Sequence, residues 1–271
     1  MIDKVDVLMC TMNNEDTIEA TLLSLFQSDT PINRIVVVDG NSIDNTIALI
    51  TDYCEVDKIP YIIIKQKSKG YGGALNEGAM SIKTKVFASI DSDTIIPVDF
   101  YKVLKPLIDI DKAILASLYN CVLGNAGLSE YYYWRSERNK MQYGLGACLI
   151  NKEYMINCLP LKELISGADS ALYKKAMLLG YKWILTRETY SYEWRDLSSE
   201  LKHLYWWGKG AYEIGQSPIR VVASFPYSIL LGVWLMRRNI RCFYAVPLRM
   251  LFYNLGYFNR ELEDILDVNK W

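Results

Sequence analysis

The sequence predicts an α/β protein with a mostly parallel, doubly wound central sheet flanked by helices. Apolar runs of strand character alternate with segments of helical apolar spacing over roughly the first hundred residues. Polar residues follow directly after several of these apolar runs. Repeated strand–helix pairs form parallel sheets whose loops gather at one edge. At 271 residues and 51% hydrophobic content, the chain can bury one sizeable core.

The first strand is expected at Val5–Cys10, and it leads through Thr11-Met12-Asn13-Asn14 into helical spacing over Thr17–Phe26. Asn13 or Asn14 is expected to cap this helix. The following elements are expected to be strand Arg34–Val38, helix Thr46–Asp52, strand Tyr61–Lys65, a helix ending at Met80 and strand Val86–Ile90. Asp39 follows the second strand, as Asp91 follows the fourth, so both should lie at the same sheet edge.

The triplet Asp91-Ser92-Asp93 is the most informative motif of the chain. On a strand, residues two apart face the same side, roughly 6.5 to 7 Å apart, so both carboxylates could address one divalent cation. The carboxyl edge of a parallel sheet is also where α/β proteins bind nucleotides. An Asp-x-Asp triplet alone is common in solvated turns, so its meaning depends on the neighbouring motifs.

Four motifs occur in the order seen in family 2 glycosyltransferases: Thr11-Met12-Asn13-Asn14, Val37 to Asp44, Lys69-Gly70 with Asn76-Glu77-Gly78, and Asp91-Ser92-Asp93. Over roughly residues 3 to 210 the chain resembles an inverting enzyme of the GT-A fold, which has a Rossmann-like sheet. The resemblance implies that a nucleotide-sugar donor binds over the first part of the sheet. It also implies that a sugar is moved to an acceptor hydroxyl.

By this resemblance, the residues expected to contact the nucleotide are Thr11, Asn13, Asp39, Lys69, Gly70, Asp91 and Ser92. Asp93 and Asp91, with His203 as a further contact, are expected to hold Mn²⁺ or Mg²⁺. Each residue also has a structural interpretation. Asp39-Gly40 could be a turn, Lys69 a solvated charge and Thr11 a hydrogen-bonding residue at a helix start. A lone histidine such as His203 is often structural.

The second half of the chain is expected to supply the acceptor side. Tyr143 to Ile150 resembles the glycine loop of the family, and Ile165 to Leu172 resembles the segment that carries the catalytic base. The resemblance makes Asp169 the base, which takes the acceptor proton as the new bond forms. Asp169 could instead cap its helix. Many relatives have glutamate before this aspartate, whereas this chain has Ala168, which leaves the acceptor type open.

Water must be excluded so that the donor is not hydrolysed, and a closing loop is expected within Trp183 to Leu197.

The composition changes after residue 201. The charged residues from there to residue 260 are Lys202, Lys209, Arg220, Arg237, Arg238, Arg241, Arg249 and Arg260, opposed only by Glu213. Sixteen uncharged residues lie between Arg220 and Arg237, fewer than the roughly 20 needed to span a bilayer. A C-terminal amphipathic helical hairpin on an anionic membrane surface is expected. A core helix pair or an interface between protomers is the alternative.

The amino terminus lacks a basic leader followed by a long apolar run, and the six cysteines lack Cys-x-x-Cys spacing. We therefore expect reduced, buried cysteines and a cytoplasmic protein, peripheral on the cytoplasmic face of a membrane. The net charge of −1 makes nucleic acid a weak candidate partner. Whether the aromatic tail also pairs protomers into a homo-oligomer stays an open question.

Three regions are expected: a donor half at 1–118, an acceptor and base half of the same domain at 119–200, and a basic aromatic tail at 201–271. The expected function is metal-dependent inverting transfer from a nucleoside diphosphate sugar to a glycan or polyprenyl-linked acceptor. The donor is expected to carry uridine diphosphate, with guanosine diphosphate mannose as the alternative. A sugar-phosphate nucleotidyltransferase and a nucleotide-sugar-binding scaffold without turnover are the competing functions.

Overall fold

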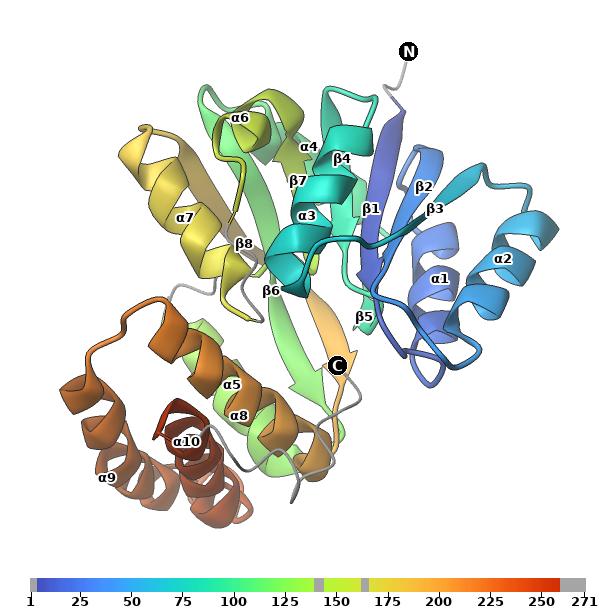
Figure 1. Ribbon diagram of the computed structural model, residues 1–271. Helices are drawn as coiled ribbons and strands as arrows, with labels where there is room; N and C mark the ends of the chain where they lie inside the picture. Colours follow the sequence, from blue (N-terminus) through green and yellow to red (C-terminus); the bar gives the residue numbers. More distant parts are fainter. Residues whose placement is uncertain (1–3, 139–143, 162–165, 259–271) are drawn as a thin grey trace. The chain divides into compact units, whose positions relative to one another are not determined.

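A computed structural model describes residues 4–138, 144–161 and 166–258 of the chain. These residues form two compact units, with unit boundaries inside two long strands, after Asn120 and after Tyr192. The first unit carries most of the sheet and its flanking helices, and the second is mainly helical (Figure 1). The expected division at residues 118 and 200 concerns binding roles, so it stays a prediction.

The sheet has eight strands in the order β3-β2-β1-β4-β7-β6-β8-β5. Their bounds are β1 Val5–Thr11, β2 Ile32–Asp39, β3 Tyr61–Lys65, β4 Val86–Ile90, β5 Thr94–Ile95, β6 Ala113–Leu123, β7 Ala147–Asn151 and β8 Lys182–Trp194. The strands β3, β2, β1 and β4 are parallel to one another, whereas β7 pairs antiparallel with both β4 and β6. The order of the first four strands confirms the doubly wound arrangement expected from the sequence.

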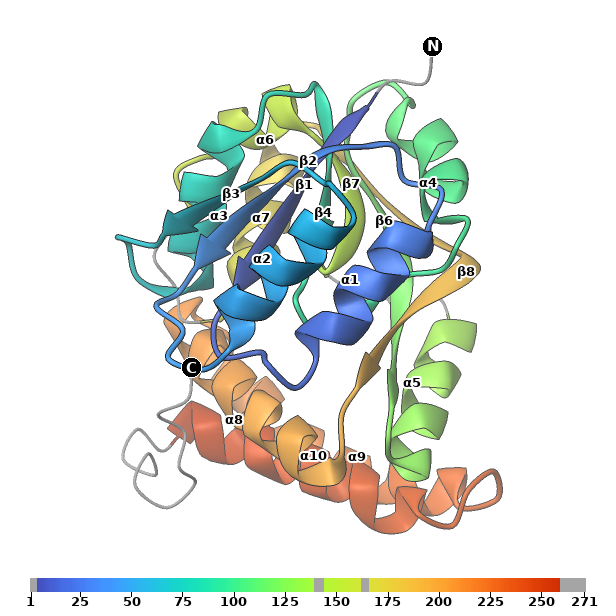
Figure 2. The ribbon, with the colours of Figure 1, turned by 90° about the vertical axis from the view of Figure 1, so that its right-hand side faces the viewer.

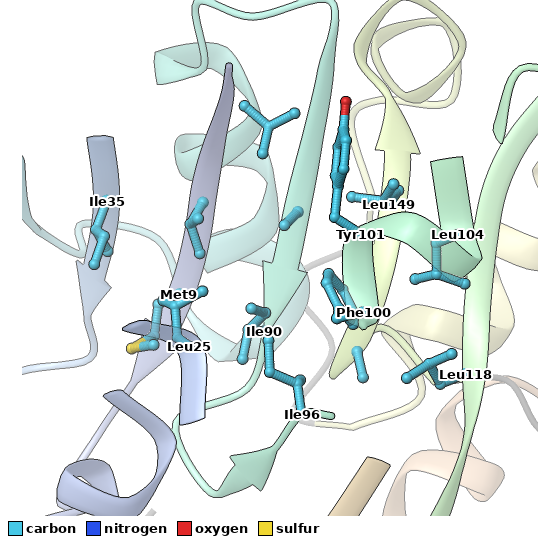
Figure 3. Packing of buried hydrophobic residues seen from close by; sticks show 14 of the residues in the cluster. Met9, Leu25, Ile35, Ile90, Ile96, Phe100, Tyr101, Leu104, Leu118 and Leu149 are labelled. Atoms are coloured by element: carbon cyan, nitrogen blue, oxygen red, sulfur yellow. The ribbon is translucent and has the colours of Figure 1, made fainter. Parts of the chain in front are cut away.

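Two apolar clusters lie on opposite faces of the sheet in the first unit. Helices α1 (Ile18–Gln27), α2 (Thr46–Val56) and α4 (Phe100–Ile108) cover one face, and Figure 2 views the side covered by α1 and α2. In that cluster Phe100 and Leu104 of α4 pack near Ile90, Leu118 and Leu149 of the strands (Figure 3). Helices α3 (Gly70–Ser81), α6 (Lys152–Asn157) and α7 (Ala168–Leu178) cover the other face.

A buried carboxylate anchors the start of the sheet. Asp6 of β1 is fully buried and accepts hydrogen bonds from Asn33 Nδ2 at 2.7 Å, from the Lys83 N–H at 2.7 Å and from Arg34 at 3.3 Å. A buried charge is tolerated only when it is paired and hydrogen-bonded in this way. The cluster therefore ties β1 to β2 and to the segment that enters β4.

The second unit contains α5 (Ala126–Glu137), α8 (Leu197–Glu213), α9 (Pro218–Leu235) and α10 (Cys242–Phe258). Helix α10 packs against α5, α8 and α9. A Cβ atom at Gly208 or Gly256 would collide with the backbone of the facing helix, so these glycines permit the close approach of α8 and α10. The expected helical hairpin is thus part of a larger helical unit.

A buried ion network crosses the second unit. Glu200 Oε1 accepts from the Tyr132 hydroxyl at 2.8 Å and from Arg249 Nε at 3.2 Å, while its Oε2 accepts from Arg195 at 3.3 Å. Arg195 also pairs with Glu193. Because Glu200 is fully buried, these contacts fix α5, α8 and α10 to one another at a single carboxylate.

Two local expectations were wrong. Neither Asn13 nor Asn14 caps α1, because Thr17 occupies the N-cap position and makes no side-chain cap hydrogen bond. The expected closing loop within Trp183 to Leu197 is instead largely the 13-residue strand β8, which lies between β6 and β5 in the sheet, so sheet pairing holds this segment extended. All six cysteines are free and five of them are buried, as expected.

Among the described helices, α9 alone is long and apolar enough to cross a membrane by length and composition, and 28% of that stretch is buried.

Candidate functional site

Three neighbouring parallel strands end at one edge of the first unit with polar residues. Thr11 at the end of β1 lies opposite Asp39 at the end of β2, and β4 on the other side of β1 is followed by Asp91. The chain turns from one side of β1 to the other between β3 and β4, which makes this edge a topological switch point. Ligands of doubly wound proteins bind in the crevice outside such a point.

The side-chain oxygen of Asn14 joins the loops at this edge. It accepts hydrogen bonds from the Thr11 hydroxyl at 3.2 Å, the Met12 N–H at 3.2 Å and the Ser92 hydroxyl at 2.8 Å. The Thr17 hydroxyl adds a bond to the Ser92 carbonyl at 3.1 Å. The loop after β1 and the triplet after β4 are therefore held together by one buried amide. The Ser92 hydroxyl thus contributes to the contact between these two loops.

Asp39 and Asn13 shape the loop that follows β2. Asp39 is 8% exposed, and its Oδ1 accepts the Ser42 N–H at 3.0 Å. Asn13, at φ 53°, donates its backbone N–H to the Ser42 hydroxyl at 3.0 Å and accepts the Ile43 N–H at 2.9 Å with its side chain. Asn13 thus binds the neighbouring loop, while Asp39 lies at the strand end where it was expected.

Lys69 occupies the N-cap position of α3, and its side chain is exposed. Gly70 follows at φ 68°, a left-handed conformation that favours glycine. Glu77, which lies further along α3, accepts hydrogen bonds from the Ser68 N–H at 2.7 Å and from the Ser68 hydroxyl at 2.6 Å. These hydrogen bonds lower the pKa of Glu77. The loop that presents Lys69 is therefore fastened to its own helix.

The triplet Asp91-Ser92-Asp93 lies in a tight turn after β4, because the Thr94 N–H donates to the Asp91 carbonyl at 3.0 Å. The strand geometry assumed from the sequence does not apply to it. The Asp91 N–H donates to the Gly146 carbonyl at 3.0 Å, which ties the turn to the residue before β7. Within the described residues, no three His, Cys, Asp or Glu side chains gather to hold a metal.

Tyr71 and Gly146 confine the carboxylate of Asp91 on two sides. The Tyr71 hydroxyl donates to Asp91 Oδ1 at 2.9 Å. A Cβ atom at Gly146 would lie 2.6 Å from Asp91 Oδ2, closer than carbon and oxygen can approach. Burial, followed by the Asp91 charge, raises the pKa of Tyr71 well above its usual value, so the phenol stays a neutral donor.

Asp169 begins the first turn of α7, and its Oδ1 accepts the Ser170 N–H at 2.7 Å. Burial raises the pKa of Asp169 from 3.8 to about 6, against the lowering effect of the backbone hydrogen bonds. Asp169 also contributes to the raised pKa of Tyr71, so the charges of Asp169 and Asp91 both act on one hydroxyl. The first unit therefore brings Asp169 into electrostatic range of the Tyr71–Asp91 pair.

His203 lies on α8 in the second unit. Burial, and then the charge of Arg195, lower the pKa of His203 well below 6.5, so the imidazole is neutral at physiological pH. Its ring stands edge-on to Trp207 with centroids 6.3 Å apart. A neutral imidazole is the form that binds metals, and the metal role of His203 stays a prediction.

Three residues of the site were not among the predicted nucleotide, metal or catalytic residues: Tyr71, Asn14 and Gly146. Tyr71 lies within the glycine-rich run after β3, but nothing in that run indicates which carboxylate its hydroxyl meets. Asn14 is adjacent to the chosen Asn13, and only the loop conformation decides which amide turns inward. Tyr143, Ile165 and the tail beyond residue 258 lie outside the described residues.

The sequence model of the family described as glycosyl transferase family 2 matches residues 6–178. A poly-β-1,6-N-acetyl-D-glucosamine synthase of Staphylococcus epidermidis is 26% identical over 104 residues, which is 38% of this chain and 25% of that protein. The matched part thus spans about a quarter of the length of this relative.

Solved structures resemble nearly the whole chain. The mannosyltransferase PcManGT from Pyrobaculum calidifontis, in complex with GDP-Man and Mn²⁺, superposes with a TM-score of 0.67 at 16% identity, covering 95% of this chain and 88% of that one. The structure of S. aureus TarS residues 1–349, in complex with UDP-GlcNAc, superposes with a TM-score of 0.56 at 16% identity, covering 94% of this chain and 90% of that one. At this identity the likeness shows a shared GT-A fold.

Proposed function

The chain belongs to glycosyl transferase family 2 and is a glycosyltransferase, and from this premise we propose that it moves a sugar with inversion from a nucleoside diphosphate sugar to an acceptor hydroxyl or phosphate. The observation that carries the proposal is the convergence of Asp39 and Asp91 at the switch-point edge, with Asp169 in electrostatic range of Asp91's partner Tyr71. Nucleotide-binding groups and a base are then available in one unit.

Asp169 is proposed as the base that takes the acceptor proton. Inverting transfer is a direct displacement, so the incoming hydroxyl must lose its proton as the new bond forms. Burial holds the pKa of Asp169 at about 6, which leaves the carboxylate mostly ionised near pH 7 and more basic than an ordinary aspartate. The hydrogen bond from the Ser170 N–H orients one oxygen and leaves the other for the acceptor.

Asp91 and Asp93 fit a divalent cation by their chemistry. Mn²⁺ and Mg²⁺ prefer oxygen ligands, and Mg²⁺ sites commonly use one or two carboxylates with phosphate and water completing the shell. Two aspartates in one tight turn, without a third described His, Cys, Asp or Glu, match such an open site. A bound cation would stabilise the charge that develops on the leaving diphosphate. Tyr71 and Gly146 orient the Asp91 carboxylate for this role.

The donor is proposed to be a uridine diphosphate sugar. Thr11 and Asp39, paired across β1 and β2, are proposed to contact the base and ribose, and Lys69 at the start of α3 is proposed to contact the nucleotide. One similar structure contains UDP-GlcNAc and another contains GDP-Man, so guanosine diphosphate mannose is the competing donor. The polysaccharide product named for the matched relative also supports a glycan acceptor.

The acceptor is proposed to be a glycan or a polyprenyl-linked sugar near a membrane, with the protein on its cytoplasmic face. The six free cysteines agree with a reducing compartment. The basic, aromatic second unit agrees with a membrane-proximal acceptor.

Calorimetric titration tests the donor site. UDP and GDP are titrated with and without Mn²⁺ into the wild type, into Asp93→Ala and into Asp52→Ala, which removes an exposed carboxylate of α2 as a matched control. Mn²⁺-dependent binding of UDP that is lost only in Asp93→Ala is expected. Binding of neither nucleotide, or equal binding by all three proteins, contradicts the proposal.

Transfer assays with the preferred nucleotide sugar and Asp169→Asn separate the competing functions. A glycosyltransferase loses sugar transfer but keeps nucleotide binding in this variant. A binding scaffold shows no transfer in the wild type, and a nucleotidyltransferase forms nucleotide sugar from sugar phosphate and nucleoside triphosphate.

A further inference from the structure

Helix α9 carries an apolar stripe on the side turned away from its own unit. Its buried residues, among them Val221, Ser228, Leu231 and Leu235, repeat at helical spacing and pack in the helical unit. The residues on the opposite side are exposed although they are apolar, and they are Ile219, Val222, Ile229, Leu230 and Val233. Ile219 and Leu230 are 80% and 72% exposed. A contiguous exposed apolar stripe indicates a partner surface.

The charged residues of the segment that contains this stripe have one sign. Between residues 214 and 258 the chain contains five arginines and no aspartate, glutamate or lysine. Arg249 is buried against Glu200, whereas Arg220, Arg237, Arg238 and Arg241 are exposed. Arg238 pairs with Glu130 and Glu137 of α5. The remaining three arginines flank the ends of α9, so the surface suits an anionic partner.

An open aromatic pocket of about 330 Å³ adjoins the stripe. Its lining residues come from the end of α5 and from α9: Trp134, Arg138, Tyr227, Leu230, Leu231 and Trp234. The Arg237 guanidinium stacks 3.6 Å from the centre of the Trp234 ring. The Arg138 guanidinium lies 5.0 Å from the centre of the Trp134 ring and 5.5 Å from that of Trp234. The pocket thus combines an apolar floor with the Arg138 guanidinium, and the Arg237 guanidinium stacks on Trp234, one of the lining residues.

This combination matches the interface of a phospholipid bilayer. Tryptophan and tyrosine favour the headgroup depth, apolar side chains enter the acyl region and arginines meet the phosphates. Arginine also binds phosphate through two parallel N–H donors. Leu230 belongs to both the stripe and the pocket, so one lipid chain in the pocket would be continuous with the lipids against the stripe.

A second copy of the chain fits this surface less well. A two-fold interface places the same patch of each protomer face to face. Arg220, Arg237 and Arg241 would then approach the same arginines of the other copy, because the 214–258 segment has no acidic residue and Glu130 and Glu137 of α5 already pair with Arg238. Spanning is also disfavoured, because α9 packs along α10 and buries Val221, Leu231 and Leu235 inside the helical unit.

We propose that the stripe of α9 and its aromatic pocket dock the protein on an anionic phospholipid bilayer, with a lipid chain in the pocket and its phosphate on Arg138 and Arg237. Docking of this kind does not depend on sugar transfer. It goes beyond the proposed function because it assigns a surface, its lipid chemistry and the residues that hold it.

The test is vesicle flotation of the full chain with two vesicle compositions, pure phosphatidylcholine and phosphatidylcholine with about 30 mol % phosphatidylglycerol, which gives the second vesicle a negative surface potential. Leu230→Glu and Val233→Glu probe the stripe, and Arg237→Gln probes the guanidinium. Leu178→Glu is the matched control, since Leu178 is an 87% exposed leucine on helix α7 of the first unit. Thermal melting checks that each variant is folded.

Wild type and Leu178→Glu should float with anionic vesicles, and added salt should weaken that binding. Leu230→Glu and Val233→Glu should each weaken binding at least about tenfold, and Arg237→Gln about fivefold. No flotation of the wild type, equal binding of folded Leu230→Glu and Leu178→Glu, or equal binding to both compositions overturns the proposal. A wild-type dimer that Leu230→Glu dissociates, without lipid binding, would instead make the stripe a protomer interface.

Discussion

Replacing Asp169 with asparagine should abolish transfer and, at neutral pH, make the protein more stable. The wild-type carboxylate is ionised at pH 8 in a site that disfavours its charge, because burial outweighs the hydrogen bond from the Ser170 N–H. Asparagine has nearly the same shape, and its carbonyl oxygen can accept the same N–H. The substitution therefore removes the unfavourable charge and keeps the local contact.

The size of the effect follows from proton linkage. Burial raises the pKa of Asp169 from 3.8 to about 6, so between these pH values the folded protein holds a proton that the unfolded chain has released. The stability of the wild type thus falls as pH rises through this range. At about 1.4 kcal/mol for each pH unit, the full loss is about 3 kcal/mol. Because Asp169 is partly exposed, solvent screening makes this an upper bound.

Two measurements test the reasoning together. Thermal melting of the wild type and Asp169→Asn at pH 4 and pH 8 should give nearly equal melting temperatures at pH 4. At pH 8 the variant should melt several degrees higher, up to roughly 10 °C. In initial-rate assays the wild-type kcat should rise tenfold per pH unit below about 6 and level off above it, since the base must be ionised.

A variant that melts below the wild type at pH 8 would refute the assignment of burial as the dominant effect on Asp169. A wild-type kcat that shows no inflection near pH 6 would contradict its role as the base even if the stability result held.

Three further predictions concern the turn, the sheet and the helical unit. Gly146→Ala should displace the Asp91 carboxylate and weaken Mn²⁺-dependent nucleotide binding about 10- to 100-fold in calorimetry, without unfolding the first unit. Asp6→Ala should cost about 3 to 5 kcal/mol in urea unfolding, because Arg34 then loses its partner for a partly buried charge. Glu200→Ala should destabilise the second unit by a similar amount, about 3 to 5 kcal/mol, and lower the melting transition of that unit.

Each of these has a clear contrary result. Unchanged nucleotide binding by Gly146→Ala would mean that the Asp91 carboxylate is not held for the ligand. Stability losses below about 1 kcal/mol for Asp6→Ala or Glu200→Ala would mean that these buried pairs contribute no more than surface pairs do. Lys174→Ala, at an exposed position of α7, is a suitable control for the unfolding measurements.

The first four strands could be predicted from the sequence because each is a short, almost purely apolar run. The expected bounds of Tyr61–Lys65 and Val86–Ile90 coincide with β3 and β4. Between Asp93 and residue 143 no element was expected, although α4, β6 and α5 lie there. Helix α4 is only nine residues long and contains Pro106, which disfavours a helix interior, and β6 is an 11-residue run that is apolar apart from Ser117 and Asn120. An apolar run without alternation does not distinguish a buried strand from a buried helix, so tertiary packing decides the structure there.

The edge of the sheet that carries the candidate site was predictable for the same reason, since parallel strands deliver their ends to one edge. The contacts of the Asp91 carboxylate could not be predicted from the sequence. Gly146 reaches Asp91 because β7 pairs antiparallel with β4, with Ala147 opposite Ile90. Strand pairing between segments about 57 residues apart leaves no trace in local spacing. The turn at the triplet likewise follows from the Thr94–Asp91 hydrogen bond, which a strand interpretation of the motif could not anticipate.

The single amide oxygen of Asn14 has a consequence for engineering donor selectivity. Since it binds Thr11, Met12 and Ser92 at once, the loop expected to meet the base and the turn expected to carry the metal share one fixed point. A substitution that remodels the first loop to accept another base will also shift the second. Changes of nucleotide preference should therefore arise together with changes in metal preference, and libraries that vary both loops should outperform libraries that vary one.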